Sequence, residues 1–228
     1  MDVAENFRKI RAAIDETAIG CKRAPSDIEL MAVTKYVDTE RIAQAISAGA
    51  RTVGENRVQE YLEKEAFFRE QGVQADIIGR LQTNKVKYIA GKVRYIQSVD
   101  RLSLAEEISR FCVKHNAEQD ILVEVNIGGE EQKGGVTVVE LFGLLKEIAA
   151  LPAIHVKGLM CVPPALSEQE AEPYFAQMRE LFIKVADAEI ENVTMKELSM
   201  GMSGDFRAAV RQGATIVRVG SAIFGPRY

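Results

Sequence analysis

Segments typical of strands and of helices alternate along the chain after Pro25, and this alternation constrains the fold more than any other feature. Short apolar runs are separated by segments in which apolar residues recur every three or four positions. The runs expected to form strands are 29–34, 51–55, 75–79, 92–99, 120–127, 154–160, 195–200 and 215–220. Strands that alternate with helices pair in parallel through right-handed crossovers.

Eight such units favour a small (β/α)8 barrel, the TIM-barrel architecture, and a doubly wound open sheet is the alternative. Before the first strand, Val3, Phe7, Ile10 and Ile14 recur at helical spacing, which predicts an extra N-terminal helix. No low-complexity linker interrupts the 228 residues. We therefore expect one domain over residues 1–228.

Three local signals predict where helices begin. Asp38 and Asp100 each precede a helical pattern and are expected to act as N-caps. The segment TVVE, residues 137–140, has the spacing of a capping box and predicts a helix start there.

Composition excludes several classes of function. The net charge of −4 provides no global basic field for nucleic acid or membranes, and no apolar run approaches the roughly 20 residues of a membrane span. The basic stretch 80–94 alternates with apolar positions, so we expect a solvated face there. Two histidines and three widely spaced cysteines predict no metal site, and the cysteines indicate a reduced, cytoplasmic protein.

A lysine stands at the end of the first strand, in LMAVTKYVD, residues 30–38. Met31, Val33 and Lys35 share one face of that strand, so Lys35 points into the barrel mouth if Val33 points inward. A partly buried lysine loses hydration of its ammonium, which lowers its pKa, and a neutral amine can form a Schiff base with a carbonyl. The alternative is a lysine that extends into solvent from the strand end.

Two turns near the C-terminus are rich in glycine and serine. ELSMGMSGD, residues 197–205, follows the seventh strand, and IVRVGSAIFGPRY, residues 216–228, contains the eighth. Loops after strands seven and eight commonly bind phosphate in these barrels, because backbone N–H groups approach the anion closely. Ordinary turn formation is the alternative explanation for these residues.

Arg218 lies just before the second of these turns, on the same strand face as Ile216 and Gly220. A guanidinium inside the mouth needs an acceptor, which a phosphate, a ring nitrogen or an inward carboxylate such as Glu197 or Glu124 could supply. An imine-forming lysine, a phosphate site and a cation able to face a ring nitrogen together match pyridoxal 5′-phosphate (PLP).

The sequence also resembles the family of pyridoxal-phosphate homeostasis proteins, which are related to the barrel domain of alanine racemase. The matching stretches are AVTKYV, VGENRVQE, IGRLQTNK, VNIGGEEQKGG, GLMCVPP, LSMGMSGD and VRVGSAIFGPR. The resemblance implies the alanine racemase N-terminal-domain type of barrel, with Lys35 carrying the cofactor as an aldimine and Arg218 facing the pyridine nitrogen. It further implies a set of contacts with the phosphate and the rest of the cofactor: Asn56, Ser199, Met200, Gly201, Gly220 and Ser221.

One departure from the family pattern precedes IGRLQTNK. The family usually has an aromatic residue and a histidine there, whereas this chain has Ala75 and Asp76. Any role of that histidine is therefore not expected in this chain.

The resemblance leaves a choice between a binding protein and an enzyme. We expect a monomeric PLP-binding protein that takes part in intracellular vitamin B6 homeostasis, with amino acids and PLP-dependent apoenzymes as partners and little or no turnover. The alternative is a PLP-dependent amino-acid racemase, and a lysine-dependent aldolase without cofactor is a third reading. Racemases need a second acid/base group, which alanine racemases take from an additional domain and a partner chain. We expect no such domain after Tyr228. Tyr36 and Tyr61 are possible substitutes, although Tyr36 is expected to point away from the face of Lys35.

Overall fold

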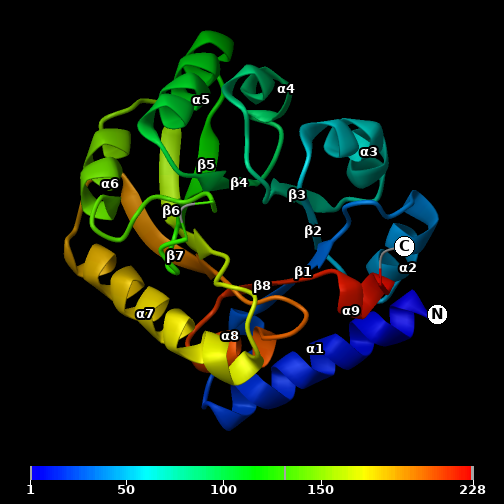
Figure 1. The fold of residues 1–228 in the computed structure, drawn as a ribbon. Coiled ribbons are helices and arrows are strands. Elements are labelled where there is room, and N and C mark those ends of the chain that lie inside the picture. Colours follow the sequence, from blue (N-terminus) through cyan, green and yellow to red (C-terminus); the bar gives the residue numbers. More distant parts are fainter. Residues whose placement is uncertain (1, 131, 227–228) are drawn as a thin grey trace.

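The computed structural model describes residues 2–130 and 132–226. Eight parallel strands close into a barrel in the order β1 to β8 (Figure 1). The strands are β1 (Glu29–Val33), β2 (Thr52–Glu55), β3 (Gln74–Ile77), β4 (Tyr95–Val99), β5 (Gln119–Val125), β6 (Ile154–Cys161), β7 (Val193–Ser199) and β8 (Ile216–Val219). Strand β8 pairs with β1, with Val217 opposite Leu30, and this pairing closes the sheet. The expected barrel is confirmed, because an open sheet would leave two strands without a second neighbour.

Helices surround the barrel and connect successive strands (Figure 1). They are α1 (Val3–Gly20), α2 (Thr39–Ser47), α3 (Val58–Glu70), α4 (Val86–Ile89), α5 (Leu102–His115), α6 (Leu141–Ala149), α7 (Glu168–Asp187), α8 (Phe206–Arg211) and α9 (Ser221–Phe224), with short 3₁₀ turns η1 (Pro25–Asp27) and η2 (Thr83–Lys85). No helix in the described residues is both long enough and apolar enough to cross a membrane.

The structure confirms one of the three predicted helix starts. Asp38 caps α2, because its Oδ1 accepts the N–H of Arg41 at 2.8 Å. The expected cap at Asp100 is wrong: α5 begins only after Arg101, and the Asp100 carboxylate pairs with the Arg101 guanidinium at 2.5 Å instead. The segment 137–140 does form its internal hydrogen bonds, but as a turn, and α6 begins after it.

The extra N-terminal helix is confirmed, and it covers one side of the barrel. Helix α1 lies beside α2, α8 and α9 (Figure 1). It buries an apolar face that includes Phe7 and Ile14. The Asn6 amide donates to the carbonyl oxygen of Ile223 in α9 at 3.1 Å. Because α9 has only four residues, it is too short to cover the last strand alone. Helix α1 therefore completes the outer layer where the chain's first and last strands meet.

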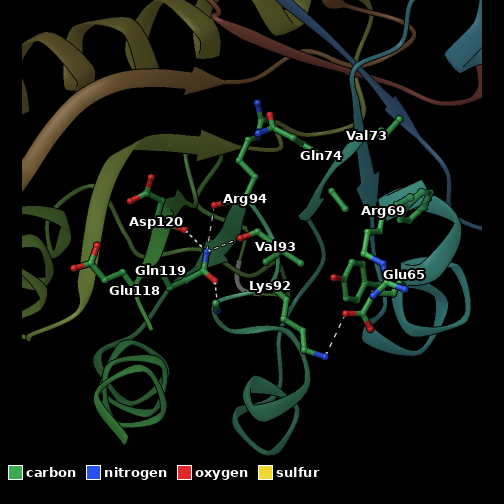
Figure 2. A pocket seen from close by; sticks show the side chains of 14 residues that line it. Glu65, Arg69, Val73, Gln74, Lys92, Val93, Arg94, Glu118, Gln119 and Asp120 are labelled. Carbon is green, nitrogen blue, oxygen red and sulfur yellow. Dashed lines mark hydrogen bonds and ion pairs between the residues drawn. The ribbon is translucent and has the colours of Figure 1, made fainter. Parts of the chain in front are cut away.

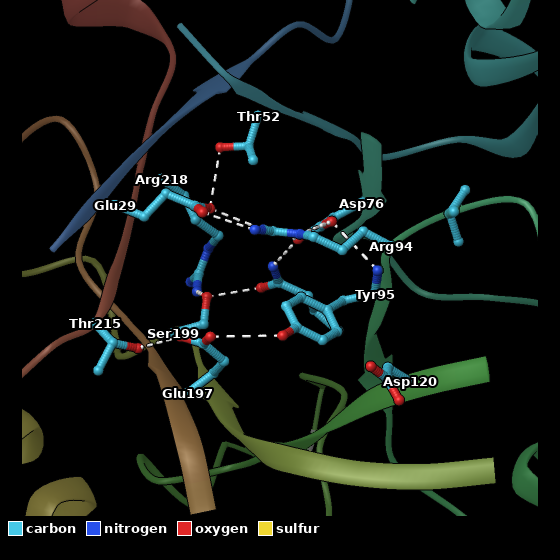
Figure 3. A network of polar contacts seen from close by, with 12 residues as sticks. Glu29, Thr52, Asp76, Arg94, Tyr95, Asp120, Glu197, Ser199, Thr215 and Arg218 are labelled. Atoms are coloured by element: carbon cyan, nitrogen blue, oxygen red, sulfur yellow. Dashed lines mark hydrogen bonds and ion pairs between the residues drawn. The ribbon is translucent and has the colours of Figure 1, made fainter. Parts of the chain in front are cut away.

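The inside of the barrel combines polar residues with a small apolar cluster of Met31, Tyr95 and Ile216, whereas the layer between strands and helices is apolar. Asp76, Gln97, Ser199 and Arg218 come from four different strands and are all buried. Figure 3 shows Asp76, Ser199 and Arg218 within this polar network. At the N-terminal end of the barrel, the Arg94 guanidinium contacts Asp76 and Glu29, each at 2.7 Å. Buried charges are tolerated when they are paired and hydrogen-bonded, as they are at this end.

A hollow of about 580 Å³ lies outside the barrel at the N-terminal ends of β3, β4 and β5 (Figure 2). Tyr61 and Phe68 of α3 line it, together with Ala75 of β3. Ala75 belongs to the apolar layer, whereas Asp76 points into the barrel. The two departures from the family pattern thus lie on opposite faces of β3.

Candidate functional site

Lys35 follows β1 at the C-terminal end of the barrel and lines a cavity of about 350 Å³. The lining consists of Val33, Lys35, Asn56, Ile78, Val162, Met202, Ser203, Gly204, Arg218, Gly220 and Ser221. These residues end or follow β1, β2, β3, β6, β7 and β8. The cavity therefore occupies the barrel mouth, where the carboxyl ends of the strands meet.

The strand end that presents Lys35 is held by a buried ion pair. Lys64 donates to the carbonyl oxygen of Thr34 at 2.8 Å and to the Glu55 carboxylate at 2.9 Å. The Thr34 hydroxyl donates to the same Glu55 oxygen at 2.6 Å. Burial raises the pKa of Glu55, and its contacts with Thr34 and Lys64 oppose that rise. These contacts fix the backbone immediately before Lys35.

The residue after the lysine is fixed as well. Tyr36 has a φ of 61°, and its backbone N–H donates to the Glu60 carboxylate at 2.7 Å. Left-handed backbone at a bulky residue is costly, so it persists only where surrounding contacts impose it. Lys35 is thus presented from a turn that is fixed on both sides.

The two glycine- and serine-rich turns lie side by side at the mouth. The turn after β7 contributes Ser203 and Gly204 to the cavity, and the turn after β8 contributes Gly220 and Ser221. The backbone N–H of Ala222 donates to the Ser203 hydroxyl at 3.3 Å and joins the two turns. Within the described residues, the N–H groups of Ser203, Gly204 and Ser221 have no hydrogen-bond acceptor. They are donors that an anion could use.

Three predicted contacts lie outside the cavity lining: Ser199, Met200 and Gly201. Ser199 ends β7 with its side chain inside the barrel, so it lies below the mouth. Gly201 has a φ of 91°, and a Cβ there would lie 2.5 Å from the Cβ of Ala209. That glycine serves the packing of the turn against α8. The part of this turn that reaches the cavity begins at Met202.

Arg218 projects inside the barrel, as predicted, but no carboxylate binds it directly among the described residues. Its guanidinium donates to the Ser199 hydroxyl at 2.6 Å and to the carbonyl oxygen of Cys161 at 2.8 Å. The alternative of a direct salt bridge to Glu197 or Glu124 is therefore wrong. Both of its observed acceptors are neutral, so the charge of Arg218 is not cancelled by its hydrogen-bond partners.

A chain of hydrogen bonds connects Arg218 to the opposite end of the barrel (Figure 3). The Ser199 hydroxyl, which accepts from Arg218, donates to Gln97 Oε1 at 2.7 Å. Gln97 Nε2 then donates to Asp76 at 2.6 Å, and Asp76 is paired with Arg94. Every bond in the chain has its donor on the Arg218 side until Asp76, so the Asp76 carboxylate orients the whole series.

Burial dominates the electrostatics of the mouth. Desolvation lowers the pKa of Arg218, and the nearby Cys161, Glu124 and Asp205 oppose this. Desolvation and the neighbouring Asp100 raise the pKa of Glu124 to about 7, against the opposing influence of Arg218. Glu124 therefore titrates at a higher pH than an ordinary carboxyl group, although it does not line the cavity.

Asn56 is placed at the cavity by a close approach of two loops. A Cβ at Gly79 would lie 2.4 Å from the carbonyl oxygen of Asn56, so only glycine allows the loop after β3 to come this near. The Oδ1 atom of Asn56 is buried and has no partner among the described residues. It remains available to a ligand.

The structure therefore brings five of the eight predicted residues into one cavity: Lys35, Asn56, Arg218, Gly220 and Ser221. Sequence patterns did not indicate the supporting residues Glu55, Lys64 and Gln97, because isolated polar residues in strands and helices carry no periodic signal.

The fold and the cavity define a (β/α)8 barrel protein that presents a lysine, a buried arginine and two N–H-rich turns at the carboxyl ends of its strands. Residues 3–228 match the family described as alanine racemase, N-terminal domain, and the chain belongs to this family.

Similar proteins cover the chain over its whole length. The pyridoxal phosphate homeostasis protein of Aquifex aeolicus is 42% identical over 228 residues, which are 100% of this chain and 99% of that protein. The protein of the same description from Escherichia coli K12 is 36% identical, and the match covers 99% of this chain and 97% of that protein. PipY of Synechococcus elongatus, solved with PLP bound, has a TM-score of 0.83 and 31% identity, with 98% of this chain and 100% of PipY covered. The resemblance expected from the sequence motifs is confirmed.

More distant structures share the fold alone. Alanine racemase from Corynebacterium glutamicum has a TM-score of 0.69 at 16% identity, and the match covers 99% of this chain and 61% of that enzyme.

Proposed function

We propose that this chain binds pyridoxal 5′-phosphate at the barrel mouth and takes part in intracellular vitamin B6 homeostasis, with little or no turnover. One observation carries the proposal: an amine, a buried guanidinium and two N–H-rich turns line a single cavity. The relatives described as pyridoxal phosphate homeostasis proteins and the PLP bound to PipY support it.

The residues present suit the cofactor. A cavity of about 350 Å³ lies within the range of small-molecule sites. The Lys35 amine would bond to the aldehyde carbon, and the N–H groups of Ser203, Gly204 and Ser221 would hold the phosphate. Arg218 would face the ring nitrogen, and Asn56 would add a polar contact. When bound, PLP supplies an electron-withdrawing ring conjugated to that carbon.

The surrounding groups favour binding over racemisation. A racemase needs a second acid/base group opposite the lysine. Tyr61 lines the hollow at the other end of the barrel, and burial raises its pKa to about 12. Tyr36 lines a smaller neighbouring cavity of about 160 Å³, which it shares with Lys35. Arg218 is a further obstacle, because a cation beside the ring nitrogen disfavours its protonation and weakens the ring as an electron sink.

The remaining expectations complete the proposal. We infer that residues 1–228 act as one cytoplasmic, monomeric domain, and that amino acids and PLP-dependent apoenzymes accept the cofactor from it. Cys21, Cys112 and Cys161 are free thiols, as a reducing compartment requires. Light scattering tests the oligomeric state, and reactivation of a PLP-dependent apoenzyme by the loaded protein tests transfer.

The deciding experiment compares wild-type protein with Lys35→Ala, and with Lys85→Ala as a matched control. PLP is added, the visible absorption band of the lysine-bound cofactor is recorded, and borohydride followed by peptide mapping locates the modified lysine. We expect the band in wild type and in Lys85→Ala, and none in Lys35→Ala with an unchanged thermal melt.

Three outcomes would contradict the proposal. Cofactor trapped on another lysine in Lys35→Ala would reassign the site. Racemisation or transamination by pure wild-type protein that vanishes in Lys35→Ala would make the racemase the better reading. Aldol turnover that needs Lys35 but not PLP would favour the third reading.

A further inference from the structure

A second cavity opens beside the first at the barrel mouth, and its charge is one-sided. It measures about 590 Å³ and is bordered by the loops after β2 and β3 and by the residue that precedes α5. Four cationic side chains line it: Arg57, Arg80, Lys85 and Arg101. No carboxylate lines it in the part of the chain that the structure describes. Such an excess is unexpected by chance in a chain with a net charge of −4.

The cations are fixed more by neutral contacts than by opposite charges. Arg101 pairs with Asp100, but its second nitrogen donates to the carbonyl oxygen of Leu81 at 3.0 Å, which holds the side chain against the cavity. Across residues 2–130 and 132–226, no carboxylate forms an ion pair with Arg57, Arg80 or Lys85. The charge of the cavity is therefore only partly compensated: Arg57 and Lys85 have no carboxylate partner in this part of the chain, whereas Arg101 pairs with Asp100 and Arg80 lies near enough to Glu124 to lower its pKa.

Neutral donors line the same cavity beside these cations. Helix α3, which has 13 residues, begins at the cavity without a side-chain cap. The N–H groups of Val58 and Gln59 have no acceptor within the described residues, and both residues line the cavity. Thr83 contributes a hydroxyl from the loop after β3. Arginine forks and free backbone N–H groups in one cavity are the donors that phosphate oxygens require.

We propose that this cavity, called the basic cavity below, binds a small phosphate monoester. Its volume suits a metabolite-sized ligand rather than a bare ion. A nucleic acid would need further uncompensated cations beyond the cavity. Among the neighbouring cations, Lys92 pairs with Glu65 at 3.3 Å and Arg94 pairs with Glu29 and Asp76, so Lys87 is the one left without an ion pair in the described residues.

Asn56 connects the basic cavity to the cavity of Lys35, because it lines both. A phosphate ester in the basic cavity would therefore contact a residue that we place at the cofactor. We infer that occupancy of one cavity changes affinity in the other, and this second step rests on the proposed function. Binding in the basic cavity itself does not.

The test uses the full ¹⁵N-labelled chain and glycerol 3-phosphate as the probe, at constant ionic strength. Backbone signals of Gln59, Thr83 and Lys85 report on the basic cavity, and those of Ser203 and Ser221 report on the cofactor cavity. We expect the first group to shift along a saturable curve. Arg80→Gln with Lys85→Gln should weaken that binding about 10- to 100-fold.

Lys87→Gln is the matched control, because Lys87 lies in the same region, over the same Tyr88 ring as Lys85, but outside the lining. It should leave the curve unchanged. Shifts that do not saturate, that persist in the double variant, or that occur only at Ser203 and Ser221 would overturn the proposal. Tighter binding of a short single-stranded RNA than of glycerol 3-phosphate would also overturn it.

The PLP band measured on the same samples separates the two proposals. A normal band with no saturable shift refutes the basic cavity alone. A saturable shift without any band refutes the proposed cofactor binding alone.

Discussion

The charge of an arginine is balanced differently at the two ends of the barrel. At the N-terminal end, Arg94 contacts the carboxylates of Glu29 and Asp76 (Figure 3). At the C-terminal end, Arg218 is more deeply buried than Arg94, yet it donates only to a hydroxyl and a carbonyl oxygen. One end has its charges neutralised within the protein, and the other retains a positive charge.

We call the N-terminal end of the barrel the closed end and the C-terminal end, with its cavity, the open end. The charges of the closed end serve stability, and those of the open end serve binding. Breaking a buried ion pair by removing one partner is costly, so the closed end resists change. At the mouth, Arg218 and the free N–H groups of the two turns stay open to an anionic ligand, because Arg218 donates only to neutral acceptors and these N–H groups have no acceptor among the described residues. The chain Asp76–Gln97–Ser199 links the ends, so the closed end orients the arginine of the open one.

The largest expected effect is at the closed end. Arg94→Met leaves Asp76 buried without its cation, and we expect the free energy of unfolding to fall by about 3–5 kcal/mol. Urea denaturation measures it. Adding Asp76→Asn to Arg94→Met should recover part of the loss, because the stranded charge is then absent. A loss below about 1 kcal/mol in the single variant would show that the ion pair does not stabilise this end.

The corresponding change at the open end should separate affinity from stability. Arg218→Met removes a buried cation that has only neutral partners, so we expect stability to change by at most about 1 kcal/mol. The affinity for PLP should fall about 10- to 100-fold, as loss of a charged hydrogen bond predicts. Fluorescence titration and urea denaturation on one preparation give both numbers. If Arg218→Met lowered stability as much as Arg94→Met, the proposed difference between the two ends would be wrong.

Glu124, near the barrel mouth, should also make the stability of the protein depend on pH. Its folded-state pKa of about 7 lies above its unfolded value, so the folded protein holds this proton more tightly. The stabilisation is complete below the unfolded pKa and is lost as pH rises through 7. Glu124→Gln should therefore exceed wild type in stability by roughly 1–3 kcal/mol at pH 8 and match it near pH 4. Parallel stability curves for the two proteins from pH 4 to 8 would contradict this assignment.

The hydrogen-bond chain predicts that a substitution at the closed end has a smaller effect on cofactor binding at the open end. Asp76→Asn lies far from the cavity lining, yet it removes the carboxylate that orients Gln97 and Ser199. We expect a shift in the absorption band of bound PLP and roughly fivefold weaker binding, and Ser199→Ala should reproduce both. If only stability changes in Asp76→Asn, the chain does not position Arg218.

The smallest effect concerns the hollow beside the closed end (Figure 2). Ala75 faces this space of about 580 Å³, where the family usually has an aromatic residue. Ala75→Phe should bury additional apolar surface against Tyr61 and Phe68 and raise stability by about 1 kcal/mol, without changing PLP affinity. Thermal melting checks the gain, and a lower melting temperature would show that the hollow cannot accept a ring.

Local patterns in the sequence determined the order of the elements and the position of Lys35. Alternating and helical apolar periodicities arise from backbone geometry, so each predicted strand and its neighbouring helix can be recognised from a few adjacent residues. Because these signals are local, they also explain where the predictions from the sequence were wrong. Asp100 has the chemistry of a cap, but its carboxylate is taken by Arg101, and LSMGMS does not reveal at which residue β7 ends.

Only the tertiary structure decided which polar residues meet. Asp76, Gln97, Ser199 and Arg218 span 142 positions in the sequence and touch because barrel closure and strand register place them in one interior. The basic cavity likewise depends on two loops and a helix start converging from separate units. Such contacts are set by the pairing of distant strands, which no periodicity within a segment records.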